Sequence, residues 1–143
     1  MDAFDADVMI YAAIPDHVLG RRVRALFPTE PSGDTGIIAG TGSVLLIPEL
    51  LTKPMRDGSE AELDALAALL SRLDLQPMNE ATANLATALG ANYGLRAADA
   101  VHLATAVSTG ADRFITNNSS DFSKDIAEID VTYPSELPEP DEV

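Results

Sequence analysis

The stretch LRAADAVHLATA, Leu95–Ala106, followed by RFIT, Arg113–Thr116, decides the fold class of this 143-residue chain. Its alanine content predicts a helix over Arg96–Ser108, because alanine is the best helix former, and Gly110 is suited to end that helix. The short apolar stretch that follows predicts a strand. A helix that leads into a short apolar strand is the unit from which α/β folds with mostly parallel sheets are built.

The rest of the chain repeats this alternation of helices and strands. Apolar residues before Asp5, which Val8–Ala12 continue, predict a short buried strand that ends near Asp5. Proline and glycine residues predict a loop between Phe27 and Ile37. The other expected elements are a helix over His17–Phe27 capped by Asp16, a strand over Ser43–Ile47, a helix with Pro48 in its first turn, a helix with a Ser59/Glu62 capping box, a short strand over Leu73–Met78, a helix from Asn79 to Gly94 and a strand over Ile126–Val131.

The composition limits the possible classes of protein. The length fits one domain, and 46% apolar residues suffice for a core without a disulfide or metal. The absence of cysteine excludes disulfides, thiolate zinc sites and cysteine nucleophiles. No apolar run approaches the roughly 20 residues of a membrane helix, and the acidic start lacks the pattern of a secretory signal, so we expect a cytoplasmic protein with no membrane contact. We expect one domain over residues 1–133 and an acidic, flexible tail over 134–143.

The net charge of −14, from 23 acidic and nine basic side chains, is the unusual feature of the composition. Such a surface repels nucleic acid, because affinity for a phosphate backbone comes mainly from Lys and Arg. Two interpretations follow. Either the protein avoids polyanions, or it works in a medium salty enough to screen the repulsion, where a high net charge also maintains solubility.

Acidic and amide side chains follow the expected strands or begin the expected helices. Asp5 and Glu49 each come directly after an apolar run, and Asp99 lies in the first turns of the alanine-rich helix. The oxygen ligands Asn117, Asn118 and Asp121 follow the strand that ends at Thr116. In a parallel sheet these junctions converge, because the carboxyl ends of the strands lie at one edge.

Converging carboxylates repel one another, and a bound divalent cation removes that cost. An all-oxygen ligand set favours Mg²⁺ or Mn²⁺ over Zn²⁺. Such an ion supports the hydrolysis of phosphate esters. The competing interpretation is that each acid is only a helix cap or a solvated loop end, and it weakens when Asp5, Glu49 and Asp99 are considered together.

Four segments in the order of the chain resemble the motifs of PIN-domain proteins. Phe4–Val8 resembles the opening Asp motif, Pro48–Leu50 the second, Leu95–Ala106 the third and most specific, and Phe114–Phe122 the fourth. In size and organisation the chain is similar to the VapC-type toxins of type II toxin–antitoxin pairs. The resemblance implies a three-layer α/β/α domain with a central, mostly parallel twisted sheet of about five strands.

The resemblance also implies a Mg²⁺- or Mn²⁺-dependent endoribonuclease, a small antitoxin partner and a homodimer. Asp5 and Asp99 would be the central metal ligands, and Glu49 would bind metal directly or through water. Asn118 stands where many relatives have an acid, so a second metal is in doubt; Asp121 could compensate, or Asn118 could hold water. Thr116 would orient water or the Asp5 carboxylate, and Asp7 would have a secondary role.

Three other functions remain open at this point. Phe4–Val8 also resembles the Asp-x-Asp opening of haloacid-dehalogenase-type phosphatases, with Asp5 as nucleophile and Asp7 as general acid, but that mechanism needs a lysine on a later loop. A PIN fold without metal would be a binding module, and a housekeeping RNA-processing nuclease would carry the same motifs. His102, three residues after Asp99, is expected to be a partly buried polar residue rather than a contact of the site.

Overall fold

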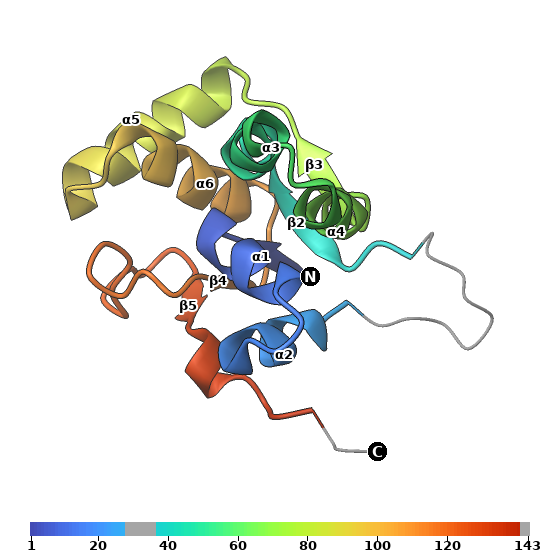
Figure 1. Ribbon diagram of the computed structural model, residues 1–143. Coiled ribbons are helices and arrows are strands. Elements are labelled where there is room, and N and C mark those ends of the chain that lie inside the picture. Colours follow the sequence, from blue (N-terminus) through green and yellow to red (C-terminus); the bar gives the residue numbers. More distant parts are fainter. Residues whose placement is uncertain (28–36, 141–143) are drawn as a thin grey trace.

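The computed structural model describes residues 1–27 and 37–140, and the predicted loop over residues 28–36 lies outside them. Strands and helices alternate along the described chain (Figure 1). The strands are β1 (Asp2–Phe4), β2 (Gly40–Ser43), β3 (Leu73–Gln76), β4 (Arg113–Ile115) and β5 (Asp130–Thr132). The helices are α1 (Ala6–Ala13), α2 (Val18–Arg24), α3 (Leu46–Asp57), α4 (Glu60–Leu70), α5 (Glu80–Tyr93), α6 (Ala97–Ser108) and the 3₁₀ helix η1 (Pro134–Glu136).

The five strands form one parallel sheet in the order β3-β2-β1-β4-β5. The chain builds outward from β1 to β3, then crosses to the other side of β1 to add β4 and β5. The connections therefore leave the sheet in opposite directions at the boundary between β1 and β4. Ligand sites of open α/β sheets lie at such a boundary, outside the carboxyl ends of the strands.

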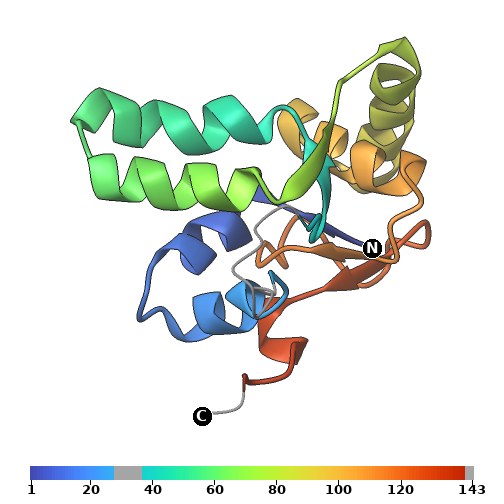
Figure 2. The same ribbon diagram turned by 90° about the vertical axis from the view of Figure 1, so that its right-hand side faces the viewer.

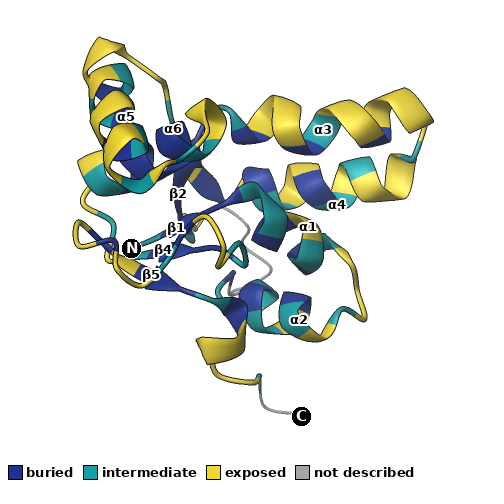
Figure 3. Ribbon diagram, turned by 90° about the vertical axis from the view of Figure 1, so that its left-hand side faces the viewer, coloured by how far each residue is buried: buried dark blue, intermediate teal, exposed yellow. Residues whose placement is uncertain are grey.

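Helices cover both faces of the sheet, which confirms the three-layer α/β/α architecture. Successive strand residues point to opposite faces. Ala3 and Phe114 pack in the core against α5 and α6, whereas Phe4 and Ile115 pack in the core against α1 to α4. Figure 2 shows α3 and α4 side by side as a helical hairpin, and Figure 3 shows that the strands are largely buried between the layers.

Several elements begin or end where local sequence signals did not place them. The run Ser43–Ile47 is not one strand, because β2 ends at Ser43 and α3 begins at Leu46, with Pro48 in its first turn as expected. A short apolar run is compatible with either element, and only packing distinguishes them. Val8–Ala12 belong to α1, which the sequence interpretation missed. The last strand covers Asp130–Thr132 rather than Ile126–Val131.

The expected helix caps are right in some places and wrong in others. Asn79 caps α5 through Thr82 N–H, and Gly94 ends that helix with a φ of 66° that favours glycine. His17, not Asp16, caps α2, since its Nδ1 accepts a hydrogen bond from Gly20 N–H at 3.0 Å. Ser59 precedes α4, but its side chain makes no capping hydrogen bond.

The first residues of the expected tail pack onto the domain. Leu137 is buried in the core against α1 to α4, and the Arg22 guanidinium donates hydrogen bonds to the carbonyls of Ser135 and Leu137 at 2.8 and 3.0 Å. Residues 134–137 are therefore part of the packed structure, beyond the expected boundary at 133. No helix among the described residues is long and apolar enough to cross a membrane.

Candidate metal centre

Asp5 lies between β1 and α1, at the boundary between β1 and β4. It is only 6% exposed. Its Oδ1 accepts the backbone N–H of Ala6 at 2.9 Å, which caps α1, and its Oδ2 accepts the hydroxyl of Thr116 at 2.8 Å. Thr116 directly follows β4 and is fully buried. Adjacent strands thus deliver an acid and a hydroxyl to one point, as the sequence predicted for strands that end at a common edge.

Asp7 lies in the first turn of α1 and joins that helix to the segment after β4. Its Oδ1 accepts Val8 N–H at 2.7 Å, and its Oδ2 accepts Asn117 N–H at 3.0 Å. Burial, followed by repulsion from Asp5, raises the pKa of Asp7 to about 6. Tyr11 OH, also on α1, accepts a hydrogen bond from Asn117 Nδ2 at 3.3 Å. The segment after β4 is therefore held to α1 by both backbone and side-chain contacts.

Asp99 reaches the site from the first turn of α6, on the opposite face of the sheet. Burial and then repulsion from Asp5 and Asp121 raise the pKa of Asp99. Burial likewise raises the pKa of Asp5, against the hydrogen bond from Thr116. Among the described residues, none donates a hydrogen bond to the Asp99 carboxylate. A half-buried carboxylate without a donor beside other acids is typical of a group that meets a cation.

Glu49 projects from the first turn of α3 and meets His102 of α6. The Oε1 of Glu49 lies 2.5 Å from Nε2 of His102, whose side chain is 1% exposed. Burial opposes the charging of His102, but the hydrogen bond to Glu49 and the surrounding acids outweigh it and raise the pKa of His102. Glu49 adds to the repulsion at both Asp5 and Asp99, so it belongs to the same acidic group.

Asn118 and Asp121 form the outer part of the site. Asn118 donates its backbone N–H to the Thr116 hydroxyl at 3.1 Å and its side-chain N–H to Asp121 Oδ2 at 2.8 Å. The Asn118 side-chain oxygen accepts the Ser120 hydroxyl at 2.9 Å. Asp121 is exposed and is fixed by this turn rather than by the central acids. The amide therefore fixes the turn that carries Asp121.

The donor set suits Mg²⁺ or Mn²⁺ because every candidate ligand is a carboxylate or amide oxygen. Across residues 1–27 and 37–140, no three His, Cys, Asp or Glu side chains are arranged so that they could all hold a metal directly. Mg²⁺ keeps several waters and takes only one or two protein carboxylates. The residues present are compatible with an ion that Asp5 and Asp99 would hold, and Glu49 would then act through water.

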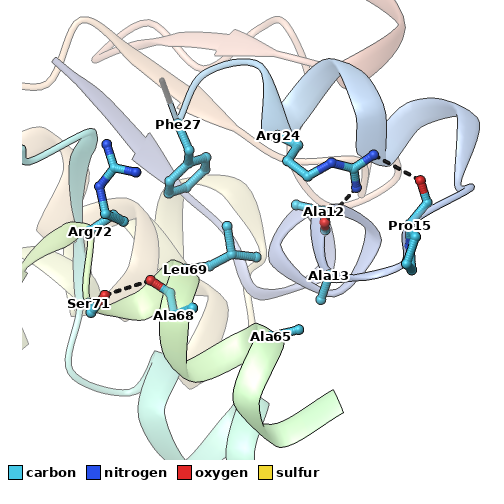
Figure 4. Close-up of a pocket in the computed structure, with 10 residues that line it drawn as sticks. All are labelled: Ala12, Ala13, Pro15, Arg24, Phe27, Ala65, Ala68, Leu69, Ser71 and Arg72. Carbon is cyan, nitrogen blue, oxygen red and sulfur yellow. Dashed lines mark hydrogen bonds between the residues drawn. The ribbon is translucent and has the colours of Figure 1, made fainter. Parts of the chain in front are cut away.

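The positions of the two lysines argue against the phosphatase alternative, and the cavity between the helices is separate from the acidic site. A phosphatase of the haloacid-dehalogenase type needs a lysine beside Asp5, but Lys53 pairs with Asp57, and Lys124 pairs with Glu136. A cavity of about 600 Å³ lies between α1, α2 and α4 (Figure 4). Among the described residues that line this cavity, none is acidic and none belongs to the acidic site, so the cavity is separate from the metal centre.

Sequence reasoning underestimated His102 and Asp7. Asp7 lies on α1, the helix that begins directly after Asp5, and His102 lies on α6. His102 follows Asp99 by three residues, which places these two side chains on one face of α6. That spacing was the available signal for His102. Their partners, Glu49 and Asn117, are 53 and 110 residues away along the chain, so no local pattern predicts the contacts.

Similar folds occur in solved toxin–antitoxin complexes. A chain of a Klebsiella pneumoniae toxin-antitoxin complex superposes with a TM-score of 0.70 at 23% identity, over 96% of this chain and 100% of that one. A chain of VapBC2 from Rickettsia felis, bound to a promoter DNA fragment, gives 0.67 at 17% identity over 92% and 97%. A chain of VapBC-1 from nontypeable Haemophilus influenzae gives 0.64 at 19% identity over 94% and 98%.

The amino-acid sequence gives the family directly. A comparison with curated proteins finds no match. The family model of the PIN domain matches residues 3–126, which include Asp5, Glu49 and Asp99. With its parallel five-stranded sheet and its acids at the β1–β4 boundary, this chain belongs to the PIN domain family.

Proposed function

We propose that this protein is a Mg²⁺- or Mn²⁺-dependent endoribonuclease and a toxin of the VapC type. The observation that carries the proposal is the buried Asp5 carboxylate at the β1–β4 boundary, with Asp7, Asp99 and Glu49 close enough to raise its pKa or to have their own raised by it. Like charges are held together at a cost that a divalent cation offsets. Such a cation, when bound, polarises a phosphate and lowers the pKa of an attacking water.

Each residue of the site would have a separate role in metal binding, orientation or proton transfer. Asp5 and Asp99 bind the cation, and Thr116 fixes the orientation of the Asp5 carboxylate through the 2.8 Å hydrogen bond. Glu49, at the rim, would accept the proton that a water molecule loses as the oxygen of that water attacks the scissile phosphate. Asn118 and Asp121 hold the outer wall of the site, where the chain departs from the usual acid of the fourth motif.

The partners follow from the same proposal. RNA would be the substrate, and a small antitoxin would occupy the acidic site with a positively charged segment, since charge-assisted hydrogen bonds to carboxylates are strong. The similar structures include a chain of a Klebsiella pneumoniae toxin-antitoxin complex, which supports this partner. A homodimer is expected as well. A short reading frame beside the gene would separate a toxin from a housekeeping RNA-processing nuclease.

Cleavage of RNA with added Mg²⁺ or Mn²⁺ and with EDTA tests the activity. We expect cleavage only with metal, and a loss of at least about 100-fold in Asp5→Asn and Asp99→Asn, because each removes a ligand charge. Asp64→Asn, an exposed change on α4, is the matched control and keeps full activity. If the two site variants cleave RNA as well as the parent, the assignment is wrong.

The inactive-module alternative is tested by binding rather than by cleavage. Titration of the parent with Mn²⁺ in a calorimeter should show binding that Asp5→Asn abolishes. A parent that binds no Mn²⁺ at about millimolar concentration would instead identify a PIN fold used only for binding.

A further inference from the structure

His102 makes an unusual connection between the two helical layers. It lies on α6 one turn after Asp99, and it contacts Glu49 of α3 at 2.5 Å. The α6 residues around it pack in the core with α5, whereas α3 packs in the core on the other face of the sheet. The contact therefore crosses the edge of the sheet at which Asp5 lies, and α6 supplies both a candidate ligand and the group that holds the third acid.

The direction of this hydrogen bond follows from the chemistry of the two groups. An ionised carboxylate only accepts, so Nε2–H of His102 donates to Glu49. The other ring nitrogen, Nδ1, is buried and has no hydrogen-bond partner in the described part of the chain. The contact with Glu49 is therefore the one directional interaction that the ring makes with those residues.

A role in packing alone does not account for an imidazole at this position. The neighbouring buried residues of α6, Val101, Leu103 and Ala104, are apolar. An apolar side chain at 102 would fill the space without leaving a buried nitrogen unpaired, which is unfavourable because the nitrogen loses its hydrogen bonds to water. The imidazole offers one thing that leucine cannot, a donor aimed at the carboxylate of Glu49.

We propose that His102 is a positioning residue that fixes the Glu49 carboxylate at the rim of the metal centre. Glu49 needs such a partner, because its side chain is 37% exposed and a free glutamate samples many rotamers. Held by His102, it presents its second oxygen to water at the site instead of moving toward Asp5 and Asp99. This inference rests on the proposed function, in which that water is used.

The affinity for Mn²⁺ tests whether His102 positions the Glu49 carboxylate. We expect His102→Leu to weaken Mn²⁺ binding in calorimetry by about 10-fold or more, the loss typical of groups that orient ligands. His102→Gln, whose side-chain N–H can replace Nε2–H, should stay within about 3-fold of the parent. In a Glu49→Ala background, His102→Leu should have no further effect. An equal loss in both backgrounds would show a merely structural role and overturn the proposal.

A spectroscopic readout without metal keeps this proposal separate from the proposed function. In ¹H–¹⁵N spectra of the metal-free protein, we expect a slowly exchanging Nε2–H signal from His102 that disappears or shifts strongly in Glu49→Ala. If the signal is absent, or is the same in both proteins, the proposal is wrong whether or not the parent binds Mn²⁺. If His102→Leu does not fold, the spectrum of Glu49→Ala and the rescue in His102→Gln still decide.

Discussion

The electrostatic cost of bringing the acids together predicts how the stability of the metal-free protein depends on pH. The pKa of Asp7 rises from 3.8 to about 6 on folding, chiefly through burial. The folded protein therefore binds this proton more tightly than the unfolded chain between these two values, and its stability falls as the pH rises across that window. At about 1.4 kcal/mol for each pKa unit, Asp7 alone destabilises the folded state above pH 6 by up to about 3 kcal/mol.

Urea unfolding in EDTA, from about pH 4 to 8, tests this cost, because urea does not screen charge. Asp7→Asn should remove the part of this slope that Asp7 contributes, and the raised pKa values of Asp5, Asp99 and His102 leave the rest. The absolute stability of the variant is less informative, since asparagine keeps only one of the two acceptor oxygens that bind Val8 and Asn117.

A matched control isolates the local effect from the net charge of −14. Asp64→Asn, on the exposed face of α4, removes the same charge and should keep the slope of the parent. Saturating Mn²⁺ should recover stability in the parent, by about 2.7 kcal/mol at 100 times the dissociation constant. Parallel pH dependence in the parent and in Asp7→Asn would refute the reasoning.

RNA cleavage by Asp7→Asn should be reduced but not abolished, whereas a phosphatase with Asp7 as general acid would lose all activity.

Three other changes have expected outcomes. Thr116→Val should lower the free energy of unfolding by about 1–3 kcal/mol in urea and weaken Mn²⁺ binding, because Asp5 Oδ2 and Asn118 N–H both lose the Thr116 hydroxyl as their partner. Thr132→Val, also buried, should leave Mn²⁺ binding unchanged. Arg96→Gln should raise KM for RNA several-fold and reduce the salt slope of binding by about one, since Arg96 is exposed at the start of α6; a slope equal to the parent's would contradict a phosphate contact. RNA cleavage should tolerate or require salt above about 0.15 M, where repulsion by the acidic surface is screened, and activity that collapses on addition of salt would leave the charge unexplained.

The local signals of this sequence were sufficient for the α/β class and for the positions of the principal acids. The alanines of α6 favour a helix and the glycine after α5 ends one, and both effects depend only on residues within one or two helical turns. They can therefore be predicted without the rest of the fold. Asp5, Glu49 and Asp99 were recognisable as a set, because three carboxylates that each lie beside an apolar run are less readily explained as helix caps or solvated loop ends than any one of them. The ordered PIN motifs added the family, which the family model confirms over residues 3–126.

The boundary between β2 and α3 could not be read locally. Val44–Ile47 are apolar in either a strand or the start of a helix, and the choice depends on what packs against them. In the structure Leu46 is fully buried and Ile47 is 42% exposed, as on a helix with one face on the core. Similarly, His17 rather than Asp16 caps α2, where its ring stacks on Tyr11 of α1 at 4.3 Å.

By itself, the sequence determined which acids lie at the ends of strands and the starts of helices, because turns, caps and apolar runs are set by neighbouring residues. Only the tertiary structure decided that β4 pairs with β1, which brings Thr116 to Asp5 and Asn117 to Asp7 across 111 and 110 residues of chain. It also decided that His102 holds Glu49. These contacts join segments that approach only when the whole sheet and both helical layers pack, so the burial that raises the pKa values of the acids is a property of the complete fold.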